Sequence, residues 1–453
     1  MRARRHFILF RWENIFFKIG YDSYQRNEAL YGKSYNVLAV IFCMKNEKGK
    51  DWGCHMKQIG KQSGEQSGKR LGRASFRLEE PVYIVGSASV VGKKEGEGPL
   101  GLLFDVVGED DFFGCGSWEE AESALQKQAV QIAMQKAGVS AEEVNLIFAG
   151  DLLGQSIASS FGLADYQIPL LGVYGACSTC GESLALGAMA VSGKFAEKVV
   201  CVTSSHFASA EKEFRFPLDY GNQRPLSATW TVTGSGAFVL SGQADGKGAG
   251  IVSCAATTNN PGEEKNNACY GNNTCYSNST DVSKAEKTSM SQGARAKISG
   301  ITIGKITDFG IKDSMNMGAC MAPASASTLE RHFIDFNSQP SDYDKIITGD
   351  LGTVGQKILI DLLQEKGYDI SDRHMDCGIE IFDAQEQDTH SGGSGCGCSA
   401  VTLSAYILKQ LEEGNWKKVL FMPTGALLSK TSFNEGKSVP GIAHGIVLES
   451  CRI

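Results

Sequence analysis

Two kinds of segment alternate along most of this chain. Short runs of aliphatic residues, typical of buried strands, are followed by longer stretches in which apolar residues recur at helical spacing. The apolar runs occupy residues 81–87, 146–149, 199–203 and 236–241, and then 345–348, 419–424 and 445–450. Because strands and helices take turns, the pattern predicts an α/β fold with a mostly parallel sheet covered by helices.

The two parts of this pattern are similar to each other. The runs at 146–149 and 345–348 both lead into a Gly-Asp pair. Thr203, which ends a predicted strand, follows Cys177 by 26 residues. Thr424 ends the corresponding strand and follows Cys398 by the same number. An internal repeat determines the architecture of a fold. The alternative is a chance similarity of two α/β units.

The stretch at 180–190 is rich in Ala, Gly and Leu and has almost no charge. A helix that is apolar on every side is buried on every side. Two repeated halves that share such central helices predict a five-layer αβαβα fold made of two pseudo-symmetric halves.

Charge and polarity divide the chain into four segments. Residues 1–55 hold 10 Lys and Arg against 5 Asp and Glu and show no sustained periodicity. We predict a basic, non-globular extension over 1–80. Its residues 1–55 are either upstream sequence, with the true start at Met56, or a flexible arm. We predict halves at 81–242 and 298–453, separated at 243–297 by an inserted loop rich in Asn, Ser and Thr.

The composition excludes several classes of protein. With 453 residues, 42% hydrophobic and 21% charged, the chain is globular rather than disordered. A net charge of −7 argues against a dedicated nucleic-acid binder. No apolar run approaches the ~20 residues that span a bilayer. The 14 cysteines form no repeating framework, which indicates a reducing compartment, and those in the insert fit no standard zinc spacing, so we expect no metal site.

The sequence Gly-Ala-Cys-Ser-Thr at 175–179 carries the clearest chemistry. A thiol at the start of a helix lies at the positive end of the dipole beside free N–H groups, which favour a thiolate and bind anions. Cys177, Ser178 and Thr179 are therefore candidate site residues, although small residues also suit close packing. His206 follows the strand 199–203 and should lie at its carboxyl end, where the binding sites of α/β folds form, so it is a further candidate site residue. The alternative is a structural role for this histidine.

These features resemble the thiolase-like superfamily, which includes thiolases and ketoacyl-ACP synthases. The resemblance implies that Cys177 occupies the position of the nucleophile and that a His, with a second His or an Asn, comes from the second half. Here Asp350 stands at the first of these positions, and the glycine-rich turn 392–396 has neither His nor Asn. An aspartate cannot donate the needed hydrogen bond unless it is kept protonated, which argues against acyl condensation.

A closer resemblance is to the stage V sporulation protein AD family. Its motifs lie at 94–101, 149–153, 175–179, 203–206, 214–217, 228–234, 392–399 and 441–445. The resemblance implies a non-catalytic thiolase fold that binds dipicolinic acid for its uptake into the developing spore. It also implies membrane proteins of the same sporulation operon as partners, and a peripheral location at the spore inner membrane. The superfamily further implies a homodimer.

Dipicolinate, a flat pyridine dicarboxylate, needs donors or cations for two carboxylates. Besides the residues at 177–179 and His206, we expect Arg215 to pair with a carboxylate, an exposed arginine being the alternative. Ser394 and Cys398 lie in the second glycine-rich turn, which should face the first across the pseudo-twofold axis.

Two carboxylates near this site fit a dianion less obviously. Asp151 and Asp350 either brace the Gly-Asp turns or contact a Ca²⁺ ion that accompanies dipicolinate. We expect no other cofactor. The alternative function is an acyl-transferring or condensing enzyme that uses Cys177.

Overall fold

The computed structural model describes residues 4–12, 15–23, 68–214, 224–244 and 293–452. The chain forms two compact units, Met1–Glu65 and Gln66–Ile453. In the first, β1 (Arg4–Trp12) and β2 (Ile15–Ser23) pair as an antiparallel hairpin. The periodicity did not indicate these strands, which are rich in the aromatic and β-branched residues that favour extended backbone. Met56 and most of the predicted insert lie outside the described residues.

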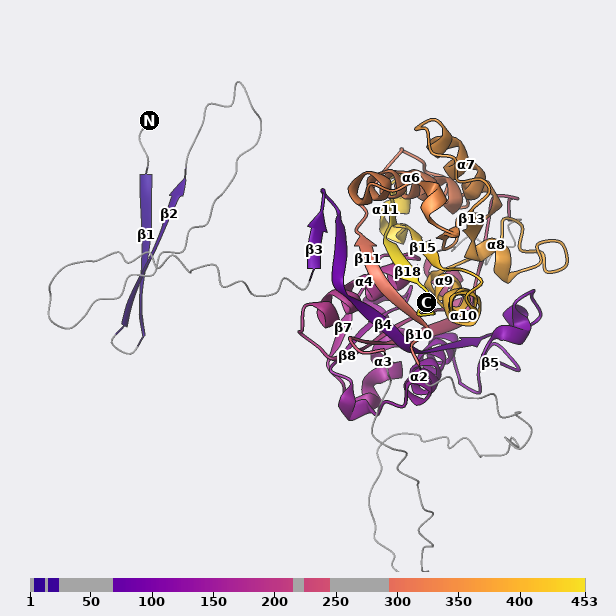
Figure 1. The fold of residues 1–453 in the computed structure, drawn as a ribbon, viewed down its shortest axis with the longest axis horizontal. Coiled ribbons are helices and arrows are strands. Elements are labelled where there is room, and N and C mark those ends of the chain that lie inside the picture. Colours follow the sequence, from indigo (N-terminus) through magenta and orange to yellow (C-terminus); the bar gives the residue numbers. More distant parts are fainter. Residues whose placement is uncertain (1–3, 13–14, 24–67, 215–223, 245–292, 453) are drawn as a thin grey trace, which may run out of the picture. The chain divides into compact units, whose positions relative to one another are not determined.

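The second unit is built on a long mixed sheet (Figure 1). The strand order is β13-β12-β15-β18-β11-β4-β10-β8-β6-β7. In the first half the bounds are β4 (Ser75–Val91), β10 (Gly234–Ser241), β8 (Lys198–Ser205), β6 (Leu146–Gly150) and β7 (Leu170–Gly172). In the second half they are β11 (Ala296–Thr302), β18 (Gly445–Glu449), β15 (Lys418–Met422), β12 (Lys345–Thr348) and β13 (His374–Asp376).

The two halves of the sheet have the same topology. In the first half β10 is antiparallel to β4 and β8, whereas β6 is parallel to β8 and β7. In the second half β18 is antiparallel to β11 and β15, whereas β12 is parallel to β15 and β13. Strands β4 and β11 pair antiparallel and join the halves. The repeat predicted from the sequence is therefore a repeat of structure.

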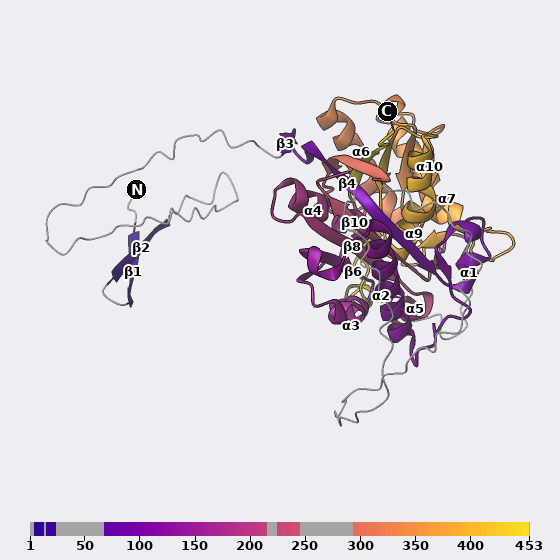
Figure 2. The ribbon, with the colours of Figure 1, turned by 60° about the horizontal axis from the view of Figure 1, so that its bottom comes forward.

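Helices cover both halves and also lie between them. The first outer layer holds α2 (Trp118–Ala137), which packs on β4, β10 and β8, and α3 (Ile157–Leu163). The central helices are α4 (Thr179–Ser192) and α9 (Cys396–Thr402), and the second outer layer holds α6 (Met317–Phe336) and α7 (Gly352–Gln364). Figures 1 and 2 show α2 and α3 on one side of this unit and α6 and α7 on the other. The predicted five-layer αβαβα fold is confirmed.

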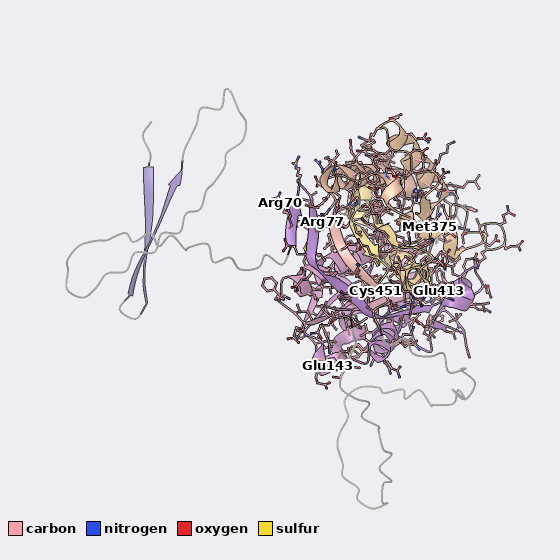
Figure 3. The ribbon with its side chains drawn as sticks, viewed as in Figure 1. Arg70, Arg77, Glu143, Met375, Glu413 and Cys451 are labelled. Carbon is pink, nitrogen blue, oxygen red and sulfur yellow. The ribbon has the colours of Figure 1, made fainter. Side chains whose placement is uncertain are left out.

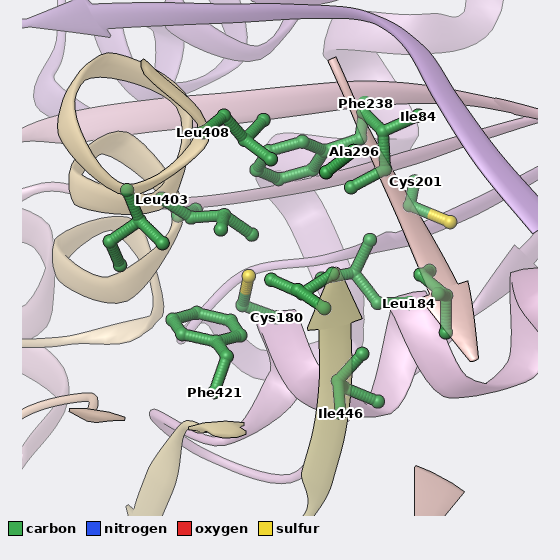
Figure 4. Close-up of a cluster of buried hydrophobic side chains, with 14 of the residues drawn as sticks. Ile84, Cys180, Leu184, Cys201, Phe238, Ala296, Leu403, Leu408, Phe421 and Ile446 are labelled. Atoms are coloured by element: carbon green, nitrogen blue, oxygen red, sulfur yellow. The ribbon is translucent and has the colours of Figure 1, made fainter. Parts of the chain in front are cut away.

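The central layer is the largest hydrophobic core. Figure 4 shows Leu184 of α4 between Phe238 of the first half and Ile446 and Phe421 of the second. Helix α4 packs on β8 and also contacts β18 of the other half. A Cβ at Gly187 would lie 2.5 Å from the Cys201 sulfur, so only glycine allows this approach. Most of the almost uncharged stretch at 180–190 is buried, as predicted, but not all of it, because Leu186 is 37% exposed.

Shorter elements complete the second unit. They are β3 (Gly68–Leu71), α1 (Lys93–Gly96), β5 (Val106–Val107), α5 (Phe207–Phe214), β9 (Trp230–Thr231), α8 (Cys377–Ile381), β14 (Gly393–Ser394), α10 (Leu408–Glu413), β16 (Thr424–Ala426), α11 (Lys430–Asn434) and β17 (Gly441–Ala443). Figure 3 places Arg70 and Arg77 on the paired strands β3 and β4. The ribbon of β9 and β14 joins the two halves beside the candidate site.

Candidate ligand-binding site

A cavity opens at the pseudo-symmetric junction of the two halves. The space between its lining residues amounts to about 380 Å³ when the part open to solvent is counted. Its lining comes from both halves: Leu152, Tyr174, Ala176, Cys177, Ala210, Phe214 and Thr231 from the first, and Met317, Ser394, Gly395, Ala426 and Leu428 from the second. Two of the predicted site residues, Cys177 and Ser394, therefore lie in one cavity.

Cys177 lies in a tight turn directly before α4. Ala176 has a φ of 51°, a left-handed conformation that is strained for a residue with a side chain. The turn passes close to the second half, since a Cβ at Gly425 would lie 2.3 Å from the Gly175 carbonyl oxygen. Cys177 is 7% exposed and lines the cavity. A strained residue beside a cysteine at the floor of a cavity is typical of a functional site.

Ser178 and Thr179 do not line this cavity, contrary to our expectation. The Ser178 hydroxyl donates to the Gly175 carbonyl at 2.7 Å, and the Thr179 hydroxyl donates to the Ala176 carbonyl at 2.6 Å. The backbone N–H groups of the same two residues also bond within the turn. The donors that the sequence offered to an anion therefore stabilise the turn itself.

Asp350 lies behind the cavity floor, where its carboxyl group contacts the Cys177 thiol through a hydrogen bond. It also accepts hydrogen bonds from the Thr424 hydroxyl at 2.6 Å and the Gly395 N–H at 3.1 Å. Burial raises the pKa of Asp350 to about 7, and the nearby Asp376 adds to this effect. The carboxyl group is thus half protonated near pH 7, which is the condition under which an aspartic acid can donate a hydrogen bond.

Asp151, the counterpart of Asp350 in the first half, braces its Gly-Asp turn. Its carboxylate accepts hydrogen bonds from the Leu153 N–H at 2.9 Å, the Ser159 N–H at 2.9 Å and the Ser159 hydroxyl at 2.7 Å. The side chain is fully buried. Of the two explanations that the sequence left open, the geometry of both aspartates matches the bracing of a turn, because their oxygens face donors of the protein.

His206 does not reach the cavity, contrary to our expectation. Its Nδ1 accepts a hydrogen bond from the Ala208 N–H at 3.2 Å, so Nε2 carries the proton and lies 2.7 Å from the Asp111 carbonyl oxygen. The ring is fully buried and stacks on Phe207. Burial lowers the pKa of His206, which keeps the ring neutral. The residue therefore holds the start of α5 in place.

The remaining predicted residues have different positions. Ser394 lines the cavity from β14. Cys398 is fully buried, and its thiol donates to the Gly349 carbonyl at 3.5 Å, away from the cavity. Arg215 lies outside the described residues, directly after Phe214, which lines the cavity.

Sequence reasoning missed most of the apolar lining. Met317 and Leu428 come from segments far apart in the chain and belong to no motif. Tyr174 directly precedes the cysteine turn, and Thr231 lies within the motif at 228–234, so these two had a signal in the sequence. Among the described residues that line the cavity there is neither His nor Asn.

The described residues include no group of three or more His, Cys, Asp or Glu side chains arranged to hold a metal ion. Among the same residues, no helix combines the length and the apolar character required to cross a bilayer.

The repeated halves, the buried central helices and the cysteine turn at their junction define a protein with a thiolase-like fold. Comparison with protein families matches residues 72–271 and 268–449 to stage V sporulation protein AD (SpoVAD). The chain belongs to this family. It is 38% identical over 378 residues to stage V sporulation protein AD of Bacillus subtilis (strain 168), an alignment that covers 83% of this chain and 97% of that protein.

Solved structures with a similar fold include synthases. One is 3-oxoacyl-[acyl-carrier-protein] synthase III from Aquifex aeolicus VF5, with 12% identity, a TM-score of 0.43, and coverage of 81% of this chain and 99% of that one. Another is the cerulenin-bound form of OleA from Xanthomonas campestris, with 11% identity, a TM-score of 0.45, and coverage of 82% and 98%. A likeness at this level carries no information about activity.

Proposed function

We propose that this sporulation protein binds dipicolinic acid in the cavity at Cys177 and does not catalyse acyl condensation. The observation that supports the proposal most directly is the lining itself. Its described residues include the cysteine but neither of the histidine or asparagine partners that a condensing enzyme uses to polarise a thioester and activate its donor. Such a cavity is suited to hold a small ligand rather than to turn it over.

The lining offers a slot for a ring and polar groups for carboxylates. Leu152, Phe214 and Met317 supply apolar surface for a pyridine ring. Thr231 and Ser394, on the paired strands β9 and β14, carry hydroxyl groups. In this proposal the charge that a dianion requires comes from Arg215, which directly follows Phe214 in the chain.

Calorimetric titration of the purified protein with dipicolinate, with and without Ca²⁺, tests the proposal. Cys177→Trp should abolish binding in a folded protein, because the indole would occupy the floor of the cavity. Leu102→Trp is the matched control, since Leu102 is fully exposed and should tolerate the same side chain with unchanged affinity. Full binding by a folded Cys177→Trp protein would place the ligand elsewhere. Tighter binding with Ca²⁺ would indicate that the metal enters with the ligand.

The second candidate is an acyl-transferring enzyme, and one observation favours it. The Cys177 thiol contacts a carboxyl group that is half protonated near pH 7, so Asp350 is a candidate proton acceptor for the thiol. Formation of a thioester on Cys177 from acyl-CoA, detected by mass spectrometry and lost in Cys177→Ala, would support this function. Turnover to a ketoacyl product would refute the non-catalytic proposal.

We also propose a homodimer that associates peripherally with the spore inner membrane and with membrane proteins of the same operon. In the described sheet β7 pairs only with β6, and its Leu170 and Leu171 are 38% and 53% exposed. An apolar edge strand of this kind suits pairing with a second copy. Analytical ultracentrifugation of Leu171→Lys tests the dimer, and fractionation of spores tests the location.

A further inference from the structure

Two carboxyl groups lie near each other in the interior behind the cavity. Asp350 follows β12, and Asp376 ends the neighbouring strand β13; each is 1% exposed. Asp376 accepts hydrogen bonds from the Thr348 hydroxyl at 2.6 Å and from the Leu351 N–H at 2.8 Å. Asp350 is the one next to the candidate site, because two of its contacts, Cys177 and Gly395, line the cavity.

The other titratable groups that face Asp350 do not offset its charge. They are Asp376, the Cys177 thiol in the turn before α4, Cys377 at the start of α8, and Cys398 in α9. Burial raises the pKa of Cys377 and Cys398 well above the usual range, so both thiols remain neutral. In the part of the chain that the structure describes, no lysine or arginine pairs with Asp350. A carboxylate ligand beside Cys177 would therefore add a negative charge to a region that already holds one or two.

We propose that a carboxylate ligand binds at Cys177 together with one proton, which comes from solvent and is taken up by the carboxyl group of Asp350. This inference rests on the proposed function, because it concerns the same cavity. Repulsion between the ligand and an ionised Asp350 is relieved when Asp350 is neutral. Burial already raises the pKa of Asp350 to about 7, so the proton is bound readily in the neutral range.

Linkage between binding and protonation sets the expected pH dependence. Well below pH 7 Asp350 already holds the proton, and the Kd should be constant. Well above pH 7 each binding event must take up a proton, and the Kd should rise about tenfold per pH unit. The carboxylates of dipicolinate, with ordinary pKa values of about 4, stay ionised throughout and do not contribute.

Calorimetric titrations at pH 6, 7, 8 and 8.5, each in two buffers of different ionisation enthalpy, measure both the Kd and the proton uptake. Uptake should approach one proton per dipicolinate at pH 8.5 and fall towards zero at pH 6. The neutral analogue pyridine-2,6-dicarboxamide should bind without proton uptake, because it brings no charge to the cavity.

Asp350→Asn identifies the group that takes up the proton. It keeps the shape of the side chain and removes its titration, so the Kd should become constant between pH 6 and 8.5. Cys177→Ser is the matched control: it removes the other titratable group at the cavity floor and should keep the proton uptake. Uptake that persists in Asp350→Asn, or that is lost in Cys177→Ser, would overturn the assignment.

The experiment separates this inference from the function on which it rests. Binding with a constant Kd and no proton uptake in the unmodified protein would refute the inference and leave the proposed function intact. Absence of binding at every pH would refute both. If Asp350→Asn does not fold, the comparison of dipicolinate with its neutral analogue still tests the inference. Proton uptake with both ligands would show that the uptake does not depend on the charge of the ligand, and would refute the inference.

Discussion

A buried acid in the motif at 94–101 should make the stability of this protein depend on pH. Glu95 is 1% exposed, and its Oε1 accepts a hydrogen bond from the Thr233 N–H at 2.9 Å. Its Oε2 has no hydrogen-bond partner among the residues that the structure describes. Burial raises the pKa of Glu95 from 4.5 to about 8. The folded protein thus keeps a proton that the unfolded chain releases near pH 4.5.

The sign and size of the effect follow from linkage. Between pH 4.5 and 8 the folded state binds more protons than the unfolded state, so the free energy of unfolding falls as pH rises, by about 1.4 kcal/mol per unit for one proton. From pH 6 to pH 8 the integrated loss from Glu95 is roughly 2 kcal/mol, since its carboxyl group is half ionised at pH 8. Glu95→Gln, which resembles the neutral acid in shape, should not show this loss.

Urea unfolding of both proteins at pH 6, 7 and 8 provides the test. At pH 6 the variant should already be roughly 2 kcal/mol more stable than the parent, because the unfolded parent ionises Glu95 above pH 4.5 whereas the amide does not titrate. Between pH 6 and pH 8 this difference in the free energy of unfolding should grow by roughly a further 2 kcal/mol. The other titrating groups are common to both proteins and cancel in this difference. The same pH dependence in variant and parent would refute the reasoning, because Glu95 would then not retain its proton.

Three other predictions concern the site and the N-terminal segment. Asp151→Ala leaves two buried N–H groups without an acceptor and should lower the free energy of unfolding by ~3–5 kcal/mol. Asp151→Asn keeps one acceptor and should lose about half as much in the same urea titration; equal losses would contradict the bracing role. His206→Ala should lower stability by ~2–4 kcal/mol, while calorimetry shows the Kd for dipicolinate changed less than about threefold, because the ring does not line the cavity. A tenfold higher Kd would instead indicate that His206 contacts the ligand. A chain that starts at Met56 should keep the melting temperature and the dipicolinate affinity of the full chain, and a large loss of either would show that residues 1–55 belong to the fold.

The local pattern of the sequence was enough to predict the architecture. Strands at 146–149 and 345–348, the uncharged helix at 180–190 and the equal spacing of Cys177 and Cys398 from the strands that follow them all depend on residues close together in the chain. Periodicity and the repeat express these features directly, since each is a local preference for burial. The cysteine turn could be predicted for the same reason.

Only the tertiary structure decided which groups meet at the site. Met317 and Leu428 line the cavity beside Cys177, although 140 residues or more separate each from it in the sequence. The helix start offers fewer donors than the sequence indicated, because Ser178 bonds within its own turn, and His206 faces the interior. The contact between Asp350 and Cys177 crosses from one half to the other, and the pKa of Asp350 rises chiefly because the packed interior excludes water from it. Desolvation is a property of the packed interior, whereas hydrophobic periodicity is a property of the chain, so the fold could be predicted from the sequence and the electrostatics of the site could not.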